Sequence, residues 1–290
     1  MSSRRYWRLK RKGSEVTQPI PRPVGYQPAE IAPDTFLIRT AFAAAGDEMT
    51  MYQSSMVIRG AQPILVDTGP AAASDLWLDA VFGLVDPEDV RWVFVSHNDS
   101  DHNGNVVSVL AACPRATLIT TSPAVARMTS SFDLPYRRMH WLNFGDTFDA
   151  GDRTIEIIDV PVYDSPVTQG LFDRATGATW AVDAFAAVVP TEDPPAFAKD
   201  LPQPVWEGAL RGLGIAANPW LEGVRPDWFT PRLKAMSGLG PTVVANAHGP
   251  ALTGTQIDRA IEIYDQLPGT TPPPGPDQDS LDTLLATHHA

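Results

Sequence analysis

Four ionisable side chains that could bind a metal ion occur close together in this chain of 290 residues. They are His97, Asp99, Asp101 and His102, and they follow the apolar, β-rich segment Trp92–Val95. That segment predicts a buried strand, and α/β sheets place their ligand sites at the ends of such strands. Packing these groups behind an apolar strand is costly unless a cation neutralises them. The spacing therefore predicts a metal site.

The direction of the side chains supports this interpretation. Alternate residues of an extended stretch point the same way, so His97, Asp99 and Asp101 can converge on one side. His102 would then turn in beside them. A polar surface loop with incidental histidines is the alternative interpretation, because short motifs also occur by chance.

The loop motif H-x-D-x-D-H resembles the metal-binding loop of the metallo-β-lactamase superfamily, whose common hydrolases carry histidine where this chain carries Asp99. An acidic residue at this position makes the motif similar to that of the flavodiiron proteins, the diiron reductases of oxygen and nitric oxide. P-I-L-V-D-T-G at 63–69, the segment Asp164–Phe185 and N-A-H-G-P at 246–250 extend the resemblance. It runs from about 35 to 255 and implies an α/β fold, a metallo-β-lactamase-like four-layer αβ/βα sandwich.

The resemblance implies that three strand ends deliver six metal ligands to one place: His97, Asp99, Asp101, His102, Asp183 and His248. His97 and Asp99 would bind the first ion, Asp183 would bridge both ions, and the other three would bind the second ion. Asp67 would lie behind the ligands as an acceptor that orients a histidine ring. A turn-forming aspartate before Thr-Gly is the alternative interpretation of Asp67.

One ligand implied by the resemblance is missing. The family carries a histidine shortly before a D-S pair, and the equivalent position here is near Pro161 and Val162, whose side chains cannot bind a metal. Tyr163 or Asp164 could supply the missing donor if the backbone shifts. We therefore expect the first ion to have fewer protein ligands than the second and to be bound more weakly.

The donor types bear on the metal and the reaction. Three carboxylates and three imidazoles form a hard, anionic set that favours iron or manganese, with zinc as the alternative. With the resemblance, this set predicts a non-haem diiron protein that binds or reduces dioxygen or nitric oxide, or uses oxygen on a small substrate. The alternative is a metal-dependent hydrolase in which a bound hydroxide attacks an ester, amide or phosphoester. A structural or sensory descendant with one metal and no turnover is the third interpretation.

The source of electrons follows from a further comparison with the family. Flavodiiron proteins carry a flavodoxin-like domain after the metal domain, and residues 249–290 are too short to form one. The sequence contains no G-x-G-x-x-G or P-loop motif either. We therefore expect no FMN domain and an external electron donor. The open side of the first site could be shared across a homodimer.

Composition narrows the partners and the compartment. The net charge of −12 argues against nucleic acid as a partner, because phosphate binding needs clustered Lys and Arg. The single cysteine, Cys113, excludes an internal disulfide and fits a reducing compartment. No apolar run is long enough to cross a bilayer, and the N-terminus lacks the pattern of a usual signal peptide. We expect a cytoplasmic protein without membrane contact.

The pattern along the chain predicts one domain with two tails. Residues 1–30 are basic and then proline-rich, which indicates an extended arm or, alternatively, a docking segment for an acidic partner or a second subunit. Residues 31–267 contain alternating apolar strands and helical segments, which predict the metallo-β-lactamase-like domain. Residues 268–290 are rich in proline and polar residues and predict a disordered tail.

Overall fold

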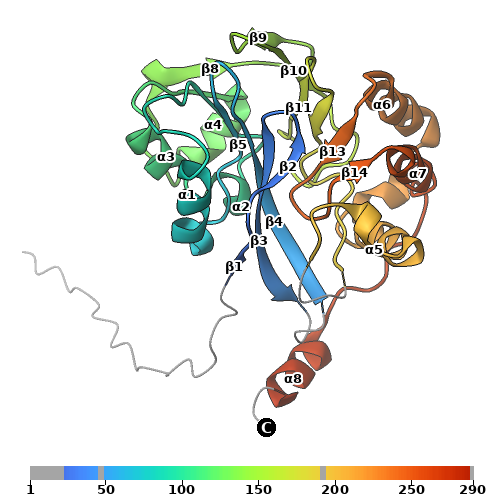
Figure 1. The fold of residues 1–290 in the computed structure, drawn as a ribbon. Helices are drawn as coiled ribbons and strands as arrows, with labels where there is room; N and C mark the ends of the chain where they lie inside the picture. Colours follow the sequence, from blue (N-terminus) through green and yellow to red (C-terminus); the bar gives the residue numbers. More distant parts are fainter. Residues whose placement is uncertain (1–22, 45–48, 190–193, 288–290) are drawn as a thin grey trace, which may run out of the picture.

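The computed structural model describes residues 23–44, 49–189 and 194–287. Most of the arm at 1–30 and the last residues of the tail at 268–290 lie outside these ranges. In the described part, two β-sheets face each other, and helices cover the outer face of each sheet (Figure 1). This arrangement agrees with the four layers expected from the sequence.

The first sheet has eight strands in the order β1-β3-β4-β5-β6-β7-β8, with β2 paired to β3. Strands β5 to β8 are parallel, and the other neighbours are antiparallel. The three residues of β5 are fully buried, as expected for a parallel strand covered on both faces. The strands are β1 (Val24–Gly25), β2 (Ala29–Ala32), β3 (Thr35–Ala44), β4 (Met49–Ile58), β5 (Ile64–Val66), β6 (Trp92–Phe94), β7 (Thr117–Thr120) and β8 (Met139–Trp141).

Helices cover the outer face of the first sheet through a separate hydrophobic cluster. Trp77 and Val81 of the first helix pack there with Leu65 and Val93 of the strands. Thr121 caps one of these helices, because its hydroxyl accepts a hydrogen bond from the Ala124 N–H at 3.0 Å. The helices of this half are η1 (Ala71–Ala73), α1 (Ser74–Phe82), α2 (Ser100–Asn103), α3 (Val106–Ala112), α4 (Ser122–Met128) and η2 (Tyr136–Arg138).

The second sheet has six strands in the order β14-β13-β12-β11-β10-β9, and only β12 and β13 are parallel. Its strands are β9 (Thr147–Asp149), β10 (Thr154–Ile158), β11 (Gly170–Asp173), β12 (Ala178–Trp180), β13 (Val243–Ala245) and β14 (Leu252–Thr253). The helices of this half are η3 (Ala198–Asp200), α5 (Gln203–Ala216), η4 (Pro219–Gly223), α6 (Pro226–Gly238) and α7 (Thr255–Tyr264). Among the described residues, no helix is long and apolar enough to cross a bilayer.

The inner faces of the two sheets share one hydrophobic core. The first sheet contributes Met56, Val66 and Phe94, which are all fully buried. The second sheet contributes Ile157 and Trp180, which are equally buried. Burying each side chain of this size stabilises the fold by about 1.5–3 kcal/mol, so this core fixes the two sheets relative to each other. Loops from both sheets can therefore hold one site.

The ends of the domain differ from the sequence expectation. The last part of the predicted arm joins the first sheet, because Val24 of β1 pairs with Ala41 of β3. The segment expected to be disordered contains helix α8 (Gln278–Thr287). Asp277 precedes this helix and its carboxylate accepts a hydrogen bond from the Ser280 N–H at 3.0 Å. Such a cap stabilises a helix by about 1 kcal/mol, which composition alone does not reveal.

We predict that Gly104→Ala strongly destabilises the protein, because a Cβ at this position has no room. The added atom would lie 2.3 Å from the Ala71 nitrogen and 2.7 Å from the Ser100 carbonyl oxygen, and both are backbone atoms. Gly212→Ala in α5 is the control, since a Cβ there meets nothing within 4 Å. Denaturant unfolding of the metal-free proteins should show a loss of about 3 kcal/mol for the first variant. The second should gain about 0.5–1 kcal/mol, and equal stabilities would contradict the prediction.

Candidate metal centre

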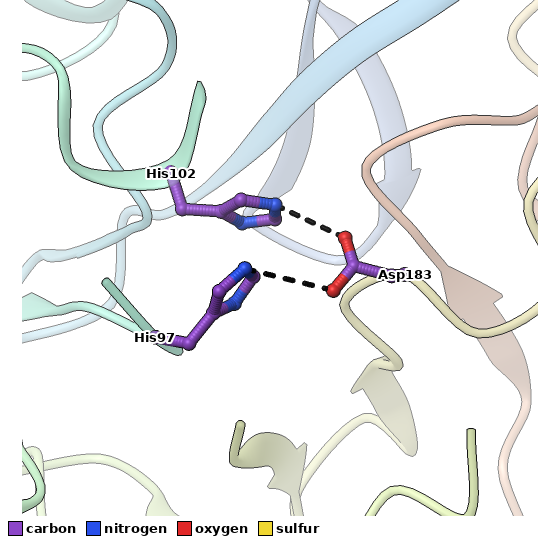
Figure 2. Close-up of side chains that lie close together, drawn as sticks. All are labelled: His97, His102 and Asp183. Atoms are coloured by element: carbon purple, nitrogen blue, oxygen red, sulfur yellow. Dashed lines mark ion pairs between the residues drawn. The ribbon is translucent and has the colours of Figure 1, made fainter. Parts of the chain in front are cut away.

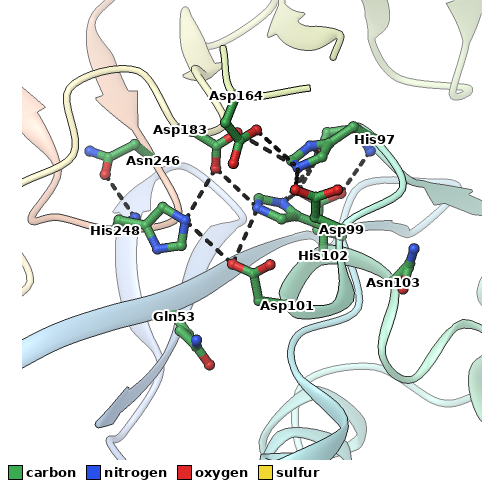
Figure 3. A network of polar contacts seen from close by, with 12 residues as sticks. Gln53, His97, Asp99, Asp101, His102, Asn103, Asp164, Asp183, Asn246 and His248 are labelled. Carbon is green, nitrogen blue, oxygen red and sulfur yellow. Dashed lines mark hydrogen bonds and ion pairs between the residues drawn. The ribbon is translucent and has the colours of Figure 1, made fainter. Parts of the chain in front are cut away.

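The six candidate ligands meet where loops from both sheets come together (Figure 3). The loop after β6 and the short helix α2 that follows it supply two each, and the turns after β12 and β13 supply one each. The carboxyl ends of neighbouring parallel strands meet at one edge of a sheet, which explains why β12 and β13 deliver their side chains to the same place. These ligands are His97, Asp99, Asp101, His102, Asp183 and His248.

One group of donors surrounds an oxygen of Asp183. Asp183 Oδ1 lies 3.0 Å from His102 Nε2 and 3.2 Å from His248 Nε2. Asp101 Oδ2 lies 3.5 Å and 3.3 Å from the same two nitrogens. Donors that each lie about 2.1 Å from one metal ion are roughly 3.0–3.5 Å apart. These four side chains therefore have the spacing of a metal site.

A second group of donors surrounds His97. Its Nε2 lies 3.7 Å from Asp99 Oδ2, 3.6 Å from Asp164 Oδ1 and 3.8 Å from Asp183 Oδ2. These separations are a few tenths of an ångström longer than in the first group. Figure 2 shows the Asp183 carboxylate facing the rings of His97 and His102 with one oxygen each. Asp183 is thus the only one of these carboxylates that borders both groups.

The donor atoms are buried and lack ordinary partners. Within the described residues, His97 Nε2, His102 Nε2 and both carboxylate oxygens of Asp183 are buried without a hydrogen bond of acceptable geometry. Leaving a buried polar atom unsatisfied costs about 1–3 kcal/mol, and more for a charged group. Four such atoms aimed at one place are explained if cations occupy the space between them. The residues present therefore fit a pair of metal ions.

Electrostatic interactions with the neighbouring histidines keep the Asp183 carboxylate ionised. Burial alone would raise the pKa of Asp183, but His102, His248 and His97 outweigh it and hold this pKa well below its ordinary value. Burial lowers the pKa of His102, yet the charges of Asp183 and Asp67 raise it well above its ordinary value. Both shifts arise largely from the close contact between the Asp183 carboxylate and the His102 ring, which favours positive charge beside this carboxylate.

Asp67 fixes the orientation of His102 from behind. Asp67 Oδ2 lies 2.8 Å from His102 Nδ1, and it accepts hydrogen bonds from Trp180 Nε1 at 2.9 Å and Ser96 Oγ at 2.9 Å. Asp67 Oδ1 accepts a hydrogen bond from the Ser96 N–H at 2.7 Å. A carboxylate oxygen that accepts a hydrogen bond from Nδ1 selects the tautomer with the proton on that nitrogen. The free Nε2 of His102 then faces the centre.

His248 is oriented by the backbone of the other sheet. Its Nδ1 lies 3.0 Å from the Tyr52 carbonyl oxygen in β4, so this nitrogen donates and Nε2 faces the centre. Its own backbone N–H donates to Asn246 Oδ1 at 3.0 Å. Sequence reasoning missed both partners. Asn246 lies two residues before His248 and could have been considered, but a backbone carbonyl has no signal in the sequence.

The turn that carries Asp183 is strained. Val182 has φ 58° and Phe185 has φ 66°, in the left-handed region that β-branched and bulky residues avoid. The Val182 carbonyl accepts a hydrogen bond from the Ala247 N–H at 2.7 Å, and the Tyr264 hydroxyl accepts one from the Phe185 N–H at 2.7 Å. Such strain costs about 1–3 kcal/mol per residue and is common at functional sites. Tyr264 was also missed, since only the fold brings it here.

The segment before β11 carries two further candidate ligands, Tyr163 and Asp164, and their side chains lie in different surroundings. The Tyr163 ring stacks on Trp220 at 5.0 Å, and Trp220 Nε1 donates to the Tyr163 carbonyl oxygen at 3.1 Å. The Asp164 carboxylate instead belongs to the group around His97 (Figure 3). Burial, followed by the charge of Asp183, raises the pKa of Asp164.

Comparison with known proteins identifies the family and supports the fold. A family model described as "ODP family beta lactamase" matches residues 51–208. The "Putative diflavin flavoprotein A 2" of Nostoc sp. is 28% identical over 261 residues, which are 87% of this chain but 43% of that protein. The chain thus spans less than half the length of this relative.

Two solved structures share the fold. The flavodiiron protein from Giardia intestinalis has a TM-score of 0.70 at 16% identity, covering 83% of this chain and 59% of that one. The rubredoxin oxygen:oxidoreductase from Desulfovibrio gigas has a TM-score of 0.68 at 19% identity, covering 83% of this chain and 61% of that one. At these identities the likeness concerns the fold alone, and it confirms the metallo-β-lactamase-like sandwich predicted from the sequence.

Proposed function

This chain belongs to the ODP family of β-lactamase-fold proteins, and we propose that it is a non-haem diiron protein that binds or reduces dioxygen or nitric oxide. The observation that carries the proposal is the carboxylate-rich set of donors on both sides of Asp183. Carboxylates are hard donors, and they favour iron or manganese more than a set dominated by histidine would. A relative named as a diflavin flavoprotein and a structural neighbour named as an oxygen oxidoreductase support this choice.

The proposal assigns each candidate ligand a place. His97 and Asp99 would hold the first ion, and Asp101, His102 and His248 would hold the second, with Asp183 shared between them. When bound, iron would supply one-electron chemistry and a coordination position for a small diatomic molecule. The chain's own residues would keep that position ready: Asp67 holds the His102 ring, and the Tyr52 carbonyl holds the His248 ring.

The exposure of the side chains gives the direction of access. The His97 side chain is fully buried, whereas 42% of the Asp99 side chain and 44% of the Asp164 side chain are exposed. A small substrate would therefore approach the centre from the side of these two carboxylates. Electrons would come from an external donor, either a protein or a small molecule.

We predict that protein produced in iron-supplemented cells contains between one and two iron ions per chain. Addition of oxygen or nitric oxide to the iron(II) protein should change its visible spectrum, because an open position on iron binds such molecules. Elemental analysis measures the iron content, and anaerobic spectroscopy before and after addition of the gas measures the spectral change. A zinc-loaded sample is the control and should remain colourless.

Two outcomes would contradict this prediction. Zinc alone, found under conditions where iron was available, would exclude the diiron proposal. Efficient hydrolysis of β-lactams or thioesters by the zinc form, with an iron form inert toward oxygen and nitric oxide, would instead indicate a metal-dependent hydrolase.

A further inference from the structure

We propose that Asp164 is the third terminal ligand of the first metal ion, and that it gives the two metal sites different metal preferences. The proposal rests on the proposed function, because it requires two bound ions. It replaces the expectation of an incomplete first site, which followed from Pro161 and Val162 at the position of the family's histidine.

Three carboxylates lie at nearly the same distance from His97. Asp164 Oδ1, Asp99 Oδ2 and Asp183 Oδ2 lie 3.6, 3.7 and 3.8 Å from His97 Nε2. None of the three is close enough to form a hydrogen bond with this nitrogen, which has no partner among the described residues. One imidazole nitrogen and three carboxylate oxygens thus enclose a common space. Asp164 is as much a part of that space as the two carboxylates assigned from the sequence.

The fold directs Asp164 toward the centre and its neighbours away from it. Val162 is fully buried and belongs to the core between the sheets, so a side chain at that position faces apolar groups. Trp220 then holds the Tyr163 carbonyl and ring. Ser165 donates from its hydroxyl to Asn98 Oδ1 at 3.2 Å, which ties the other side of Asp164 to the ligand loop. The backbone is therefore anchored on both sides of this carboxylate.

The resulting donor sets are unequal. The first site has one imidazole with three carboxylates, whereas the second has two imidazoles with two carboxylates, counting Asp183 in both. Carboxylate oxygens suit hard ions such as manganese(II) and iron(III), and imidazole suits zinc. The first site should consequently prefer manganese over zinc more strongly than the second site does.

The test compares metal binding by the full chain and three variants. Asp164→Asn removes the charged donor, Asp164→His restores the type of ligand that the family carries, and Tyr163→Phe is the matched control next to it. Each metal-free protein is titrated with manganese(II) and with zinc(II) by calorimetry, and bound metal is measured after gel filtration. Thermal unfolding of the metal-free proteins shows whether each variant is folded.

We expect the parent protein and Tyr163→Phe to bind two manganese ions per chain. Asp164→Asn should retain one ion tightly and bind the other at least about tenfold more weakly. Asp164→His should bind two ions but shift the first site toward zinc by about tenfold or more. These changes in stoichiometry and selectivity do not depend on any assay of turnover.

Two results would overturn the inference. The first is an Asp164→Asn protein that binds both ions with the parent's affinities. The second is a Tyr163→Phe protein that loses the first ion, which would make the Tyr163 phenol the ligand in place of Asp164. A parent protein that binds fewer than two ions even at saturating metal concentration would instead overturn the proposed function, which allows partial occupancy only in the protein as isolated. That failure is distinguishable because it appears before any residue is changed.

Discussion

Replacing Asp183 with asparagine should release both metal ions from the protein together. One oxygen of this carboxylate faces His102 and His248, and the other faces His97. Asparagine has nearly the same shape, but it is neutral and offers an N–H₂ group in place of one oxygen. Both ions would therefore lose a charged donor, and we expect each affinity to fall by more than about a hundredfold. Metal content after loading and gel filtration measures this loss.

His248→Ala provides the comparison for the shared carboxylate. His248 contacts Asp101 and Asp183 but none of the other donors around His97, so only the second ion should be lost. Metal-free Asp183→Asn should remain folded, because its strained turn is still held by the hydrogen bonds that Phe185 donates to Tyr264 and that Val182 accepts from Ala247. If Asp183→Asn loses one ion and keeps the other with full affinity, Asp183 does not bridge the two sites.

The part of the centre that could be predicted from sequence is the part encoded locally. The loop from His97 to His102 lies directly behind an apolar strand, so its donors are close in space whatever the rest of the fold does. Asp183 and His248 each follow an apolar segment that predicts a strand, but only the resemblance to the flavodiiron proteins assigns them to the same centre as the loop. Such strands are buried in parallel pairs, which bring their ends to one edge.

Contacts between distant segments determine the features of the centre that could not be predicted from the sequence. Strand β12 ends at Trp180, because the Ala247 N–H and the Tyr264 hydroxyl hold the following turn in a left-handed conformation. The choice between Tyr163 and its neighbour depends likewise on Trp220, which lies 57 residues further along the chain. Local propensity contains no information about either contact.

Asp67→Asn should weaken binding of the second ion by about 10- to 100-fold, although Asp67 is not a candidate ligand. Its carboxylate is fully buried and interacts with Ser96, His102 and Trp180. An asparagine N–H₂ group in place of one oxygen would face groups that are themselves donors. At least one of them would lose its partner, and the His102 ring would no longer be held in one orientation. Removing one member of such a buried charged network should also cost about 3 kcal/mol of unfolding free energy.

Asp34→Asn is a matched control for this substitution. Asp34 also has a left-handed backbone, with φ 57° against 58° for Asp67, and asparagine tolerates that conformation well. Its side chain is 52% exposed and, among the described residues, forms an ion pair with Arg59 at the surface, so we expect a change within about 0.5 kcal/mol and unaltered metal binding. Denaturant unfolding of the metal-free proteins and calorimetric titration with iron(II) or zinc(II) test both variants. Because the backbone requirement is the same, a difference between them isolates the buried hydrogen bonds of Asp67. An Asp67→Asn protein with the parent's affinity for both ions would mean that contacts other than Asp67 orient His102.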